Sequence, residues 1–269
     1  MSQSRRVIRF LAVGLVALAV ATSVSAQGPS PTRQSDEPKQ STIPARPLSP
    51  AERRAMEDIV REYILTNPEV IIESIQNMRE REQRQARNRA QSNLVKLRGE
   101  LVNDPATPAG GNPDGDVTIV EFFDYRCGYC KRVFPDVLKV LQSDKSIRLV
   151  FREFPILGPD SLTAAKAALA AWLTDKGKYQ PFHTALMQTK GALPETRVMS
   201  IATEAGLDAD ALKRAMDDPR IEQMIERNYA LAEALEINGT PAFVIGDHVI
   251  RGAIDLVSLR QLISAARGS

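Results

Sequence analysis

Apolar residues recur at helical spacing just after residue 50. Met56, Ile59, Val60 and Tyr63 follow the segment Ser49-Pro50-Ala51-Glu52. In that segment a serine can cap a helix, a proline suits the first helical position, and a glutamate three residues after the serine completes a capping box. The pattern therefore predicts a helix that begins at Pro50.

A second helix is expected after Asn67-Pro68, which breaks the first one. Its start is strongly apolar, whereas residues 79–93 are polar on all sides and resemble a solvent-crossing stalk. Helices with wide apolar faces are not stable alone. We therefore interpret residues 50–103 as an oligomerisation arm and stalk that assembles a homo-oligomer, a dimer or a trimer. The apolar positions of the second helix are Val70, Ile71, Ile72, Ile75, Met78, Leu94, Leu97 and Leu101.

A different pattern follows residues 104–115, a Pro/Gly/Asn-rich stretch that we interpret as a hinge. Short apolar runs typical of buried strands now alternate with helical patterns. This order predicts an α/β sheet with a large helical insertion. The expected strands are 117–124, 147–154, 242–245 and 249–251, and the expected helices are 128–141, a helical block over 159–236, and 255–266.

The N-terminus indicates the compartment. Arg5, Arg6 and Arg9 precede an apolar run over 10–21, and Val24-Ser25-Ala26 supplies the small residues of a cleavage site. This is the signal-peptide pattern, so we expect residues 1–26 to be removed after Ala26 and the protein to be periplasmic or otherwise extracytoplasmic. An uncleaved anchor is the alternative. Residues 27–49 contain five prolines and are expected to form a disordered tether.

Composition narrows the function further. The 269 residues are 43% hydrophobic and 25% charged, which is a globular balance. Without the three arginines of the first 26 residues, 32 basic residues face 33 acidic ones. This near-neutral chain has no electrostatic footprint for nucleic acid. Its two cysteines exclude a disulfide-stapled small fold and a four-cysteine metal site.

Both cysteines lie in Cys127-Gly128-Tyr129-Cys130, where a predicted strand ends and a predicted helix begins. At a helix N-terminus, free N–H groups and the helix dipole favour a thiolate. Two cysteines at this spacing can close a reversible disulfide across one turn, with Cys127 attacking and Cys130 resolving. A metal half-site and an inert structural disulfide are the alternatives to this redox interpretation.

Three segments resemble the DsbA-like branch of the thioredoxin superfamily. They are Glu121-Phe122-Phe123-Asp124-Tyr125, Cys127-Gly128-Tyr129-Cys130 and Gly239-Thr240-Pro241-Ala242-Phe243. The resemblance covers about residues 116–267, and it implies that residues 116–269 form a thioredoxin-like catalytic domain. Residues 50–100 further resemble the N-terminal region of the ScsC (copper-sensitivity suppressor) group.

The resemblance also implies roles for single residues. Cys127 matches the nucleophile and Cys130 the resolving cysteine, while Pro241 matches a cis-proline that faces them. Glu121 stands where such proteins keep a buried acid, so it is a candidate proton acceptor, with an ordinary strand-edge charge as the alternative. The residues expected to contact the substrate are Thr240, Gly128 and Tyr129.

The residues between the two cysteines and the residue before Pro241 differ from those of the archetypal oxidase. That oxidase carries Pro-His between its cysteines and Val before its cis-proline. Gly-Tyr and Thr in these places are similar to periplasmic disulfide isomerases. We therefore expect an isomerase or reductase of unfolded or misfolded cysteine-containing proteins, which a membrane redox partner resets. It needs no cofactor beyond the Cys127–Cys130 disulfide and no metal. A dithiol oxidase and a copper-binding periplasmic thiol protein are the alternatives.

Overall fold

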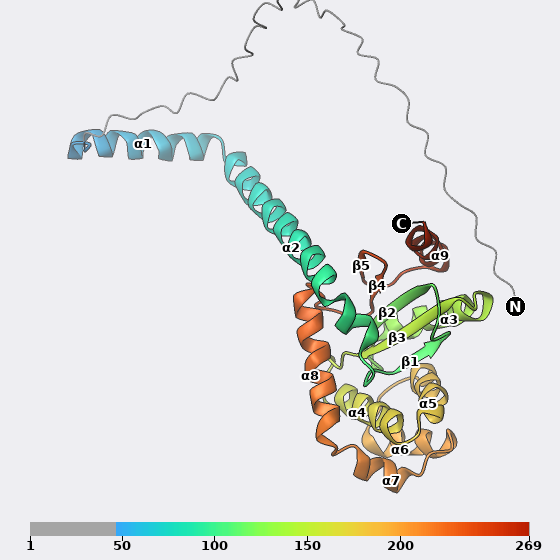
Figure 1. Ribbon diagram of the computed structural model, residues 1–269. Coiled ribbons are helices and arrows are strands. Elements are labelled where there is room, and N and C mark those ends of the chain that lie inside the picture. The colour runs from blue at the N-terminus through green and yellow to red at the C-terminus, as the bar shows by residue number, and fades with distance from the viewer. Residues whose placement is uncertain (1–46, 269) are drawn as a thin grey trace, which may run out of the picture. The chain divides into compact units, whose positions relative to one another are not determined.

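The computed structural model describes residues 47–268 (Figure 1). The chain divides into two units, with the boundary between Arg61 and Glu62. The expected signal peptide and most of the expected tether lie outside the described residues. Within residues 47–268, every helix is too short or too polar to cross a membrane.

The first unit ends within helix α1 (Pro50–Thr66). The expected capping box is present, because the Glu52 backbone N–H donates to Ser49 Oγ at 3.3 Å and the Ser49 N–H donates to Glu52 Oε2 at 2.8 Å. No side chain of α1 is buried, and Ile59 remains 65% exposed. This helix therefore presents apolar side chains that the described residues, 47–268, leave exposed.

The second unit begins with the end of α1 and continues into helix α2 (Glu69–Asn103). The polar run over 79–93 is exposed apart from Ala86, Asn93 and the buried Ala90. From Ala90 onward α2 belongs to the folded domain, since Leu94 and Leu101 are buried against the sheet. Leu94 and Leu101 thus lie before the domain expected over residues 116–269 and pack against its sheet. Apolar residues resume at helical spacing at residue 90, and these side chains cover one face of the sheet.

Five strands form one mixed sheet in the order β1-β3-β2-β4-β5. β2 and β3 are parallel, and the other neighbouring pairs are antiparallel. β2 and β3 are buried on both faces, which explains their nearly continuous apolar sequences. The strands are β1 (Ala109–Gly111), β2 (Val117–Phe123), β3 (Ile147–Glu153), β4 (Ala242–Ile245) and β5 (His248–Arg251).

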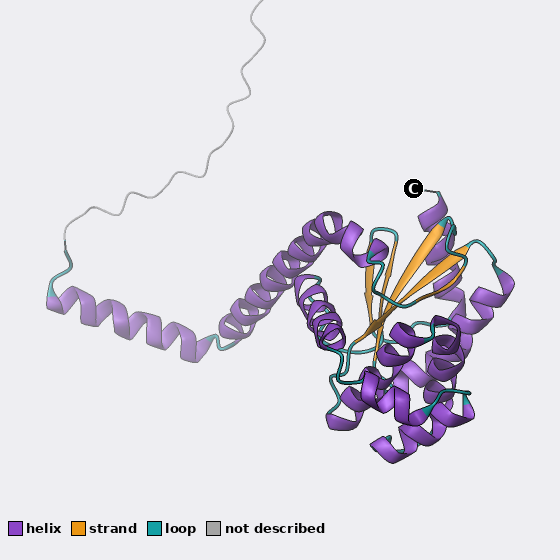
Figure 2. Cartoon of the chain, turned by 60° about the horizontal axis from the view of Figure 1, so that its bottom comes forward, coloured by secondary structure: helices purple, strands orange, loops and turns teal. Residues whose placement is uncertain are grey.

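Helices cover both faces of this sheet (Figure 2). On one face, the C-terminal part of α2 and the end of α8 (Pro219–Ala234) pack against Val120 and Phe122 of β2. On the other face lie α3 (Gly128–Ser143), α9 (Leu256–Arg267) and the helical insertion. The insertion consists of α4 (Pro159–Thr174), α5 (Lys176–Gln188), α6 (Glu195–Glu204), α7 (Ala209–Ala215) and most of α8. The expected α/β thioredoxin-like fold with a helical insertion is confirmed.

Residues 104–115 are not a free hinge. They contain β1, which pairs with β3 through Ala109 and Val150, and glycine allows the close approach because a Cβ at Gly110 would lie 3.2 Å from the Phe151 ring. Trp172 Nε1–H also donates to the Ala106 carbonyl oxygen at 2.8 Å. A glycine-rich sequence of this kind lacks the β-branched residues that identify most strands.

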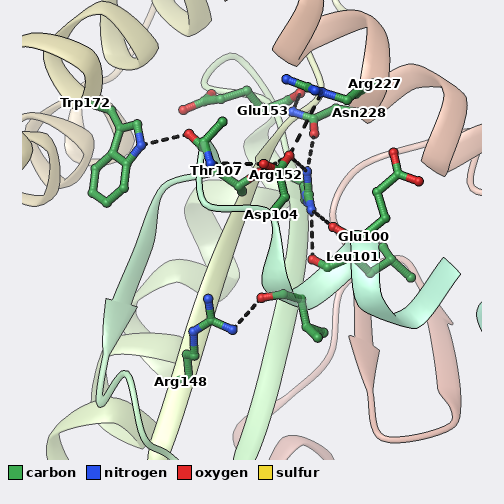
Figure 3. Close-up of polar contacts among 12 residues, drawn as sticks. Glu100, Leu101, Asp104, Thr107, Arg148, Arg152, Glu153, Trp172, Arg227 and Asn228 are labelled. Atoms are coloured by element: carbon green, nitrogen blue, oxygen red, sulfur yellow. Dashed lines mark hydrogen bonds and ion pairs between the residues drawn. The ribbon is translucent and has the colours of Figure 1, made fainter.

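Arg152 of β3 attaches the end of α2 to the sheet (Figure 3). Its guanidinium donates to the carbonyl oxygens of Glu100 at 2.6 Å and Leu101 at 2.9 Å, and to Asn228 Oδ1 of α8 at 3.1 Å. Asp104 lies 3.7 Å away as its counter-charge. These partners compensate the burial of the cation and satisfy two of the carbonyl groups that a helix end leaves free.

Candidate active site

The turn between β2 and α3 places Cys127 at the start of a helix. Cys127 is the N-cap of α3, with an extended backbone (φ −71°, ψ 113°), and its Sγ accepts a hydrogen bond from the Cys130 N–H at 3.3 Å. The sequence expectation that this cysteine begins a helix is therefore met. Both cysteines are free thiols.

The surroundings of Cys127 favour its thiolate. The Cys130 side chain, the Thr240 side chain and the backbone N–H groups of Cys130 and Tyr129 hydrogen-bond to its sulfur. Together they lower the pKa of Cys127 to about 5, against the opposing effect of burial. A thiol that is ionised at neutral pH is the attacking species in disulfide exchange.

Cys130 has the opposite character. It lies one turn inside α3 and is fully buried, and burial together with its hydrogen bond to Cys127 raises the pKa of its thiol far above the ordinary value. The two cysteines thus form an asymmetric pair, one thiolate and one protonated thiol.

The segment before β4 lies next to Cys127, because β4 is the neighbour of β2 in the sheet. β4 pairs with β2 so that Phe243 lies opposite Glu121, and this register brings Thr240 to the cysteine turn. Cys127 Sγ lies 3.3 Å from the Thr240 carbonyl oxygen, to which Cys127 donates when it is protonated. The Thr240–Pro241 peptide bond is cis, and Pro241 is buried.

Glu121 lies in the middle of β2 and is 1% exposed. Its Oε1 atom has no hydrogen-bond partner among residues 47–268. Burial, and then the negative charge of Cys127, raise the pKa of Glu121 to about 8. The carboxyl group also acts electrostatically on Cys130. Glu121 is therefore a buried carboxyl group and not a solvent-exposed edge charge.

Sequence reasoning did not identify two residues that shape this site. Asp124, in the turn, accepts hydrogen bonds from the Arg126 N–H at 2.7 Å, Ser161 Oγ at 2.8 Å and the Leu157 N–H at 3.0 Å. It thereby holds the loop after β3 against the cysteine turn. An aspartate directly after a buried strand is a turn signal, but its distant partners cannot be predicted from the sequence.

Lys131 is the second of these residues. Its ammonium group donates to the carbonyl oxygens of Leu186 at 2.8 Å and Thr189 at 2.6 Å, at the end of α5. Burial lowers the pKa of Lys131 to about 8, while Asp124 and the two cysteines favour its charged form. It provides a cation beside a cysteine pair that lacks a histidine between its members.

The surface around the cysteines is partly apolar. Tyr129, between the cysteines, is 58% exposed and stacks with the Arg132 guanidinium, 4.9 Å from the ring centre. Gly128 is exposed as well. Leu157 is also exposed, and its carbonyl oxygen accepts from Arg126 at 2.8 Å. Within residues 47–268, His, Cys, Asp and Glu side chains form no group of three or more that could hold a metal ion.

Comparisons with known families agree with this geometry. The family model described as the DSBA-like thioredoxin domain matches residues 118–264. A second model, the copper resistance protein ScsC N-terminal domain, matches residues 52–85. The first match spans more than half of the chain.

Solved structures show the same fold. A thioredoxin-like oxidoreductase from Silicibacter pomeroyi DSS-3 is 46% identical, with a TM-score of 0.62, and the match covers 64% of this chain and 98% of that one. The thiol-disulfide exchange protein alpha-DsbA2 from Wolbachia pipientis is 36% identical, with a TM-score of 0.63 and coverage of 66% and 96%. A linker-deletion variant of Proteus mirabilis ScsC is 27% identical, with a TM-score of 0.60 and coverage of 83% and 99%.

Curated relatives include longer proteins. The Na(+)/H(+) antiporter NhaA 1 of Salinispora arenicola is 28% identical over 158 residues, which are 58% of this chain. The chain spans about a quarter of the length of the antiporters that it matches, 24% in this case.

Proposed function

We propose, from the premise that this chain belongs to the DSBA-like thioredoxin domain family, that it is a thiol-disulfide oxidoreductase of cysteine-containing proteins. The observation that carries the proposal is the asymmetry of the cysteine pair. A thiolate at Cys127 stands beside a buried, protonated thiol at Cys130. Such a pair can attack a disulfide with one sulfur and resolve the product with the other.

In the reductive direction, the Cys127 thiolate attacks a substrate disulfide. A mixed disulfide forms and one substrate sulfur leaves as a thiolate. Cys130 then loses its proton and attacks Cys127 Sγ, which closes the Cys127–Cys130 disulfide and releases the second substrate thiolate. Glu121 is the group proposed to accept the Cys130 proton. Formation of the mixed disulfide removes the negative charge of Cys127, one of the two causes that raise the pKa of Glu121, and so favours its ionised form at this step.

The proposed substrates are unfolded or misfolded proteins. Exposed apolar side chains flank the cysteine turn, and an unfolded chain presents apolar segments of its own. The loop that Asp124 holds in place carries Ile156 and Leu157, which are 37% and 44% exposed. Tyr129, Gly128 and Thr240 are proposed to contact the substrate on the other sides of Cys127.

We favour isomerase or reductase action for this pair. The residues that support it are Gly128 and Tyr129 between the cysteines and Thr240 before Pro241, which are similar to those of periplasmic disulfide isomerases. Isomerisation also requires that Cys127 be reduced when it meets the substrate.

Dithiol oxidation is the second candidate, and one observation favours it. A pKa of about 5 stabilises the reduced form of Cys127 relative to the disulfide. A stabilised reduced form makes the disulfide more oxidising. The two directions therefore depend on which partner resets the pair, and we propose a membrane redox partner for that step.

Helices α1 and α2 are proposed to assemble the chain into a dimer or trimer. In the first unit, Met56, Ile59 and Val60 are more than half exposed. At the start of α2, Ile71, Ile72, Ile75 and Met78 are 40% exposed or more. Burial of such side chains is worth about 1.5–3 kcal/mol each in gross terms. Cysteine pairs held together in this way suit an isomerase, which must retain a misfolded chain during several exchanges.

We also propose an extracytoplasmic location. The basic and apolar N-terminus supports it, and a redox-active disulfide persists in an oxidising compartment. A matching structure from Salmonella enterica serovar Typhimurium is described as a periplasmic thioredoxin-like protein.

Two assays on one preparation test the proposal. Reactivation of scrambled ribonuclease in a glutathione buffer measures isomerisation, and oxidation of a reduced dithiol peptide measures oxidase action. We expect the wild-type chain to accelerate the first and Cys127→Ser to be inactive in both. Acceleration of the second alone would identify an oxidase, and failure in both would contradict the proposed function. The redox state of the pair in cells, from alkylation and gel shift, then shows which direction operates.

A further inference from the structure

A second group of buried titratable side chains lies on the same side of the sheet as Glu121. Tyr125, Glu153, Tyr179 and His183, here called the Glu153 cluster, are each 1% exposed. The Tyr125 and Tyr179 hydroxyls donate to Glu153 Oε1 at 3.1 and 3.0 Å. The Tyr125 hydroxyl also lies 2.9 Å from His183 Nδ1. The exchange steps described above do not use this cluster.

Its surroundings contain negative charge and aromatic rings. Asp124 in the turn acts on Glu153, and Glu121 on β2 acts on Tyr125. The facing side chain from α3 is Phe134, and the one from α4 is Trp172, each in ring contact with the cluster. Burial raises the pKa of Glu153 and lowers that of His183 to about 3.

The nearby cationic side chains of α3 and β3 do not pair with Glu153. Within residues 47–268, Tyr125 and Tyr179 are the hydrogen-bond donors to the Glu153 carboxylate, and Lys131 of α3 is bonded to carbonyl oxygens at the end of α5. Arg152 precedes Glu153 on β3, so its side chain points to the opposite face of the sheet, as Figure 3 shows. Within the part of the chain that the structure describes, a negative charge on Glu153 thus has hydroxyl donors but no paired cation.

The hydrogen bonds can run in two directions. In one arrangement Glu153 is a carboxylate, Tyr125 donates to it, and His183 Nδ1–H donates to the Tyr125 oxygen. In the other, Glu153 carries a proton on Oε1 and donates to Tyr125, which donates to His183 Nδ1, and the imidazole proton is on Nε2. Every bond survives in both arrangements, which differ by one proton. His183 Nε2, which has no partner within the described residues, is the atom where that proton enters.

The cluster is connected to the cysteines. Tyr125 precedes Cys127 by two residues in the same turn, and Glu121 acts electrostatically on Tyr125 and on both cysteines. A thiolate formed at Cys127 adds negative charge to this side of the sheet. Negative charge in a buried region increases the proton affinity of a nearby carboxylate.

We propose that the Glu153–Tyr125–His183 chain takes up one proton when the Cys127–Cys130 disulfide is reduced and releases it when the disulfide re-forms. This inference rests on the proposed redox function and adds a proton-storing role to it. Glu153, Tyr125 and His183 are then positioning residues for the proton and do not touch the substrate.

The step balances as follows. A substrate dithiol gives up two electrons and two protons, the Cys127–Cys130 bond breaks, and the substrate disulfide forms. One proton stays on the Cys130 sulfur, and Cys127 remains a thiolate. The second proton binds His183 Nε2, the Nδ1 proton moves to the Tyr125 oxygen, and the Tyr125 proton moves to Glu153 Oε1.

The pH dependence of the reduction potential tests this proposal, because its slope counts the protons taken up per disulfide. Equilibration with dithiothreitol buffers across neutral pH gives that number. We expect close to two protons for the wild-type chain and for the exposed control Glu233→Gln, and one fewer for Glu153→Gln. Tyr125→Phe, which interrupts the chain, should resemble Glu153→Gln. A wild-type proton number in Glu153→Gln would overturn the inference.

A second measurement covers the case in which Glu153→Gln does not fold. Redox-difference infrared spectroscopy detects a carboxyl group that becomes protonated on reduction. In the Glu121→Gln variant, Glu121 is excluded as the source of that signal. Persistence of that carboxylic acid band supports the inference, and its absence contradicts it. A chain without any reversible Cys127–Cys130 couple would instead contradict the proposed function itself.

Discussion

The Sγ atom of Cys127 lies 3.3 Å from the carbonyl oxygen of Thr240, a residue 113 positions later in the chain. The antiparallel pairing of β2 with β4 brings the two together, since both residues flank paired strands at the same edge of the sheet. We therefore propose that a substrate sulfur approaches Cys127 beside the Thr240 segment. The geometry of the site thus depends on the register of two strands as well as on the spacing of two cysteines.

The asymmetry of the cysteines predicts different outcomes for their serine variants. Cys127→Ser should reduce exchange to the uncatalysed rate, because it removes the thiolate. Cys130→Ser should accumulate mixed disulfides, because attack still occurs and resolution does not. Mass spectrometry after incubation with a disulfide-bonded substrate distinguishes them. Trapping by Cys127→Ser, with an inert Cys130→Ser, would reverse the assignment.

The raised pKa of Glu121 predicts a pH-dependent stability term in the reduced protein. In the unfolded chain Glu121 ionises near its ordinary value of 4.5, but in the folded chain it keeps its proton up to about pH 8. Folding stability from this group therefore falls as pH rises through that window. Glu121→Gln removes the loss, so its advantage over the wild-type chain should grow by a few kcal/mol between these pH values.

Urea denaturation at several pH values measures that difference. The Cys127 thiolate contributes to the raised pKa of Glu121, so the effect of Glu121→Gln should be smaller in a Cys127→Ser background. A stability difference that does not change with pH would show that Glu121 is ionised like an exposed carboxylate.

Arg152 is expected to contribute strongly to stability. Arg152→Met leaves Asn228 and the carbonyl groups at the end of α2 without their donor, which should cost about 3 kcal/mol. Arg98→Met breaks an exposed pair with Asp247 and should cost less than about 1 kcal/mol. Chemical denaturation of both variants provides the comparison. Equal losses would contradict the buried attachment of α2.

The proposed assembly through α1 and the start of α2 predicts a change of mass in solution. Ile59→Asp combined with Ile72→Asp should convert the oligomer into a monomer, because buried carboxylates without partners are costly. Val95→Asp is the matched control, since Val95 is 67% exposed on a later part of α2. Light scattering gives the mass of each variant. A monomeric wild-type chain would contradict the proposed assembly.

Local patterns predicted much of the fold. The expected strands 117–124 and 147–154 correspond to β2 and β3, and the hairpin of β4 and β5 lies around Gly246-Asp247 as its turn residues indicate. The helical block breaks near Gly191, Gly206 and Pro219 as expected, but Gly177 lies within α5, whose cap is Asp175. These features depend on residues that are close together in the sequence, so local sequence patterns predict them.

The rest depends on contacts between distant residues. β1 contains no β-branched side chain and becomes a strand only because β3 offers an edge. The burial of Leu94 and Leu101 depends on α8, more than 100 residues later. Glu153 and His183 lie 30 residues apart and meet through Tyr125, a contact that periodicity does not predict. The cysteine spacing predicted the redox pair, while its neighbours Asp124 and Lys131 became evident only in the structure.

The alkylation rate of each cysteine as a function of pH tests the asymmetric pair most directly. Iodoacetamide labelling of the reduced, folded chain followed by mass spectrometry reports Cys127 and Cys130 separately. Cys127 should react with a midpoint at about pH 5 and a constant rate through neutral pH, and Cys130 should react only after unfolding. A Cys127 midpoint near the ordinary thiol value of about 8.5, or faster labelling of Cys130, would contradict this account.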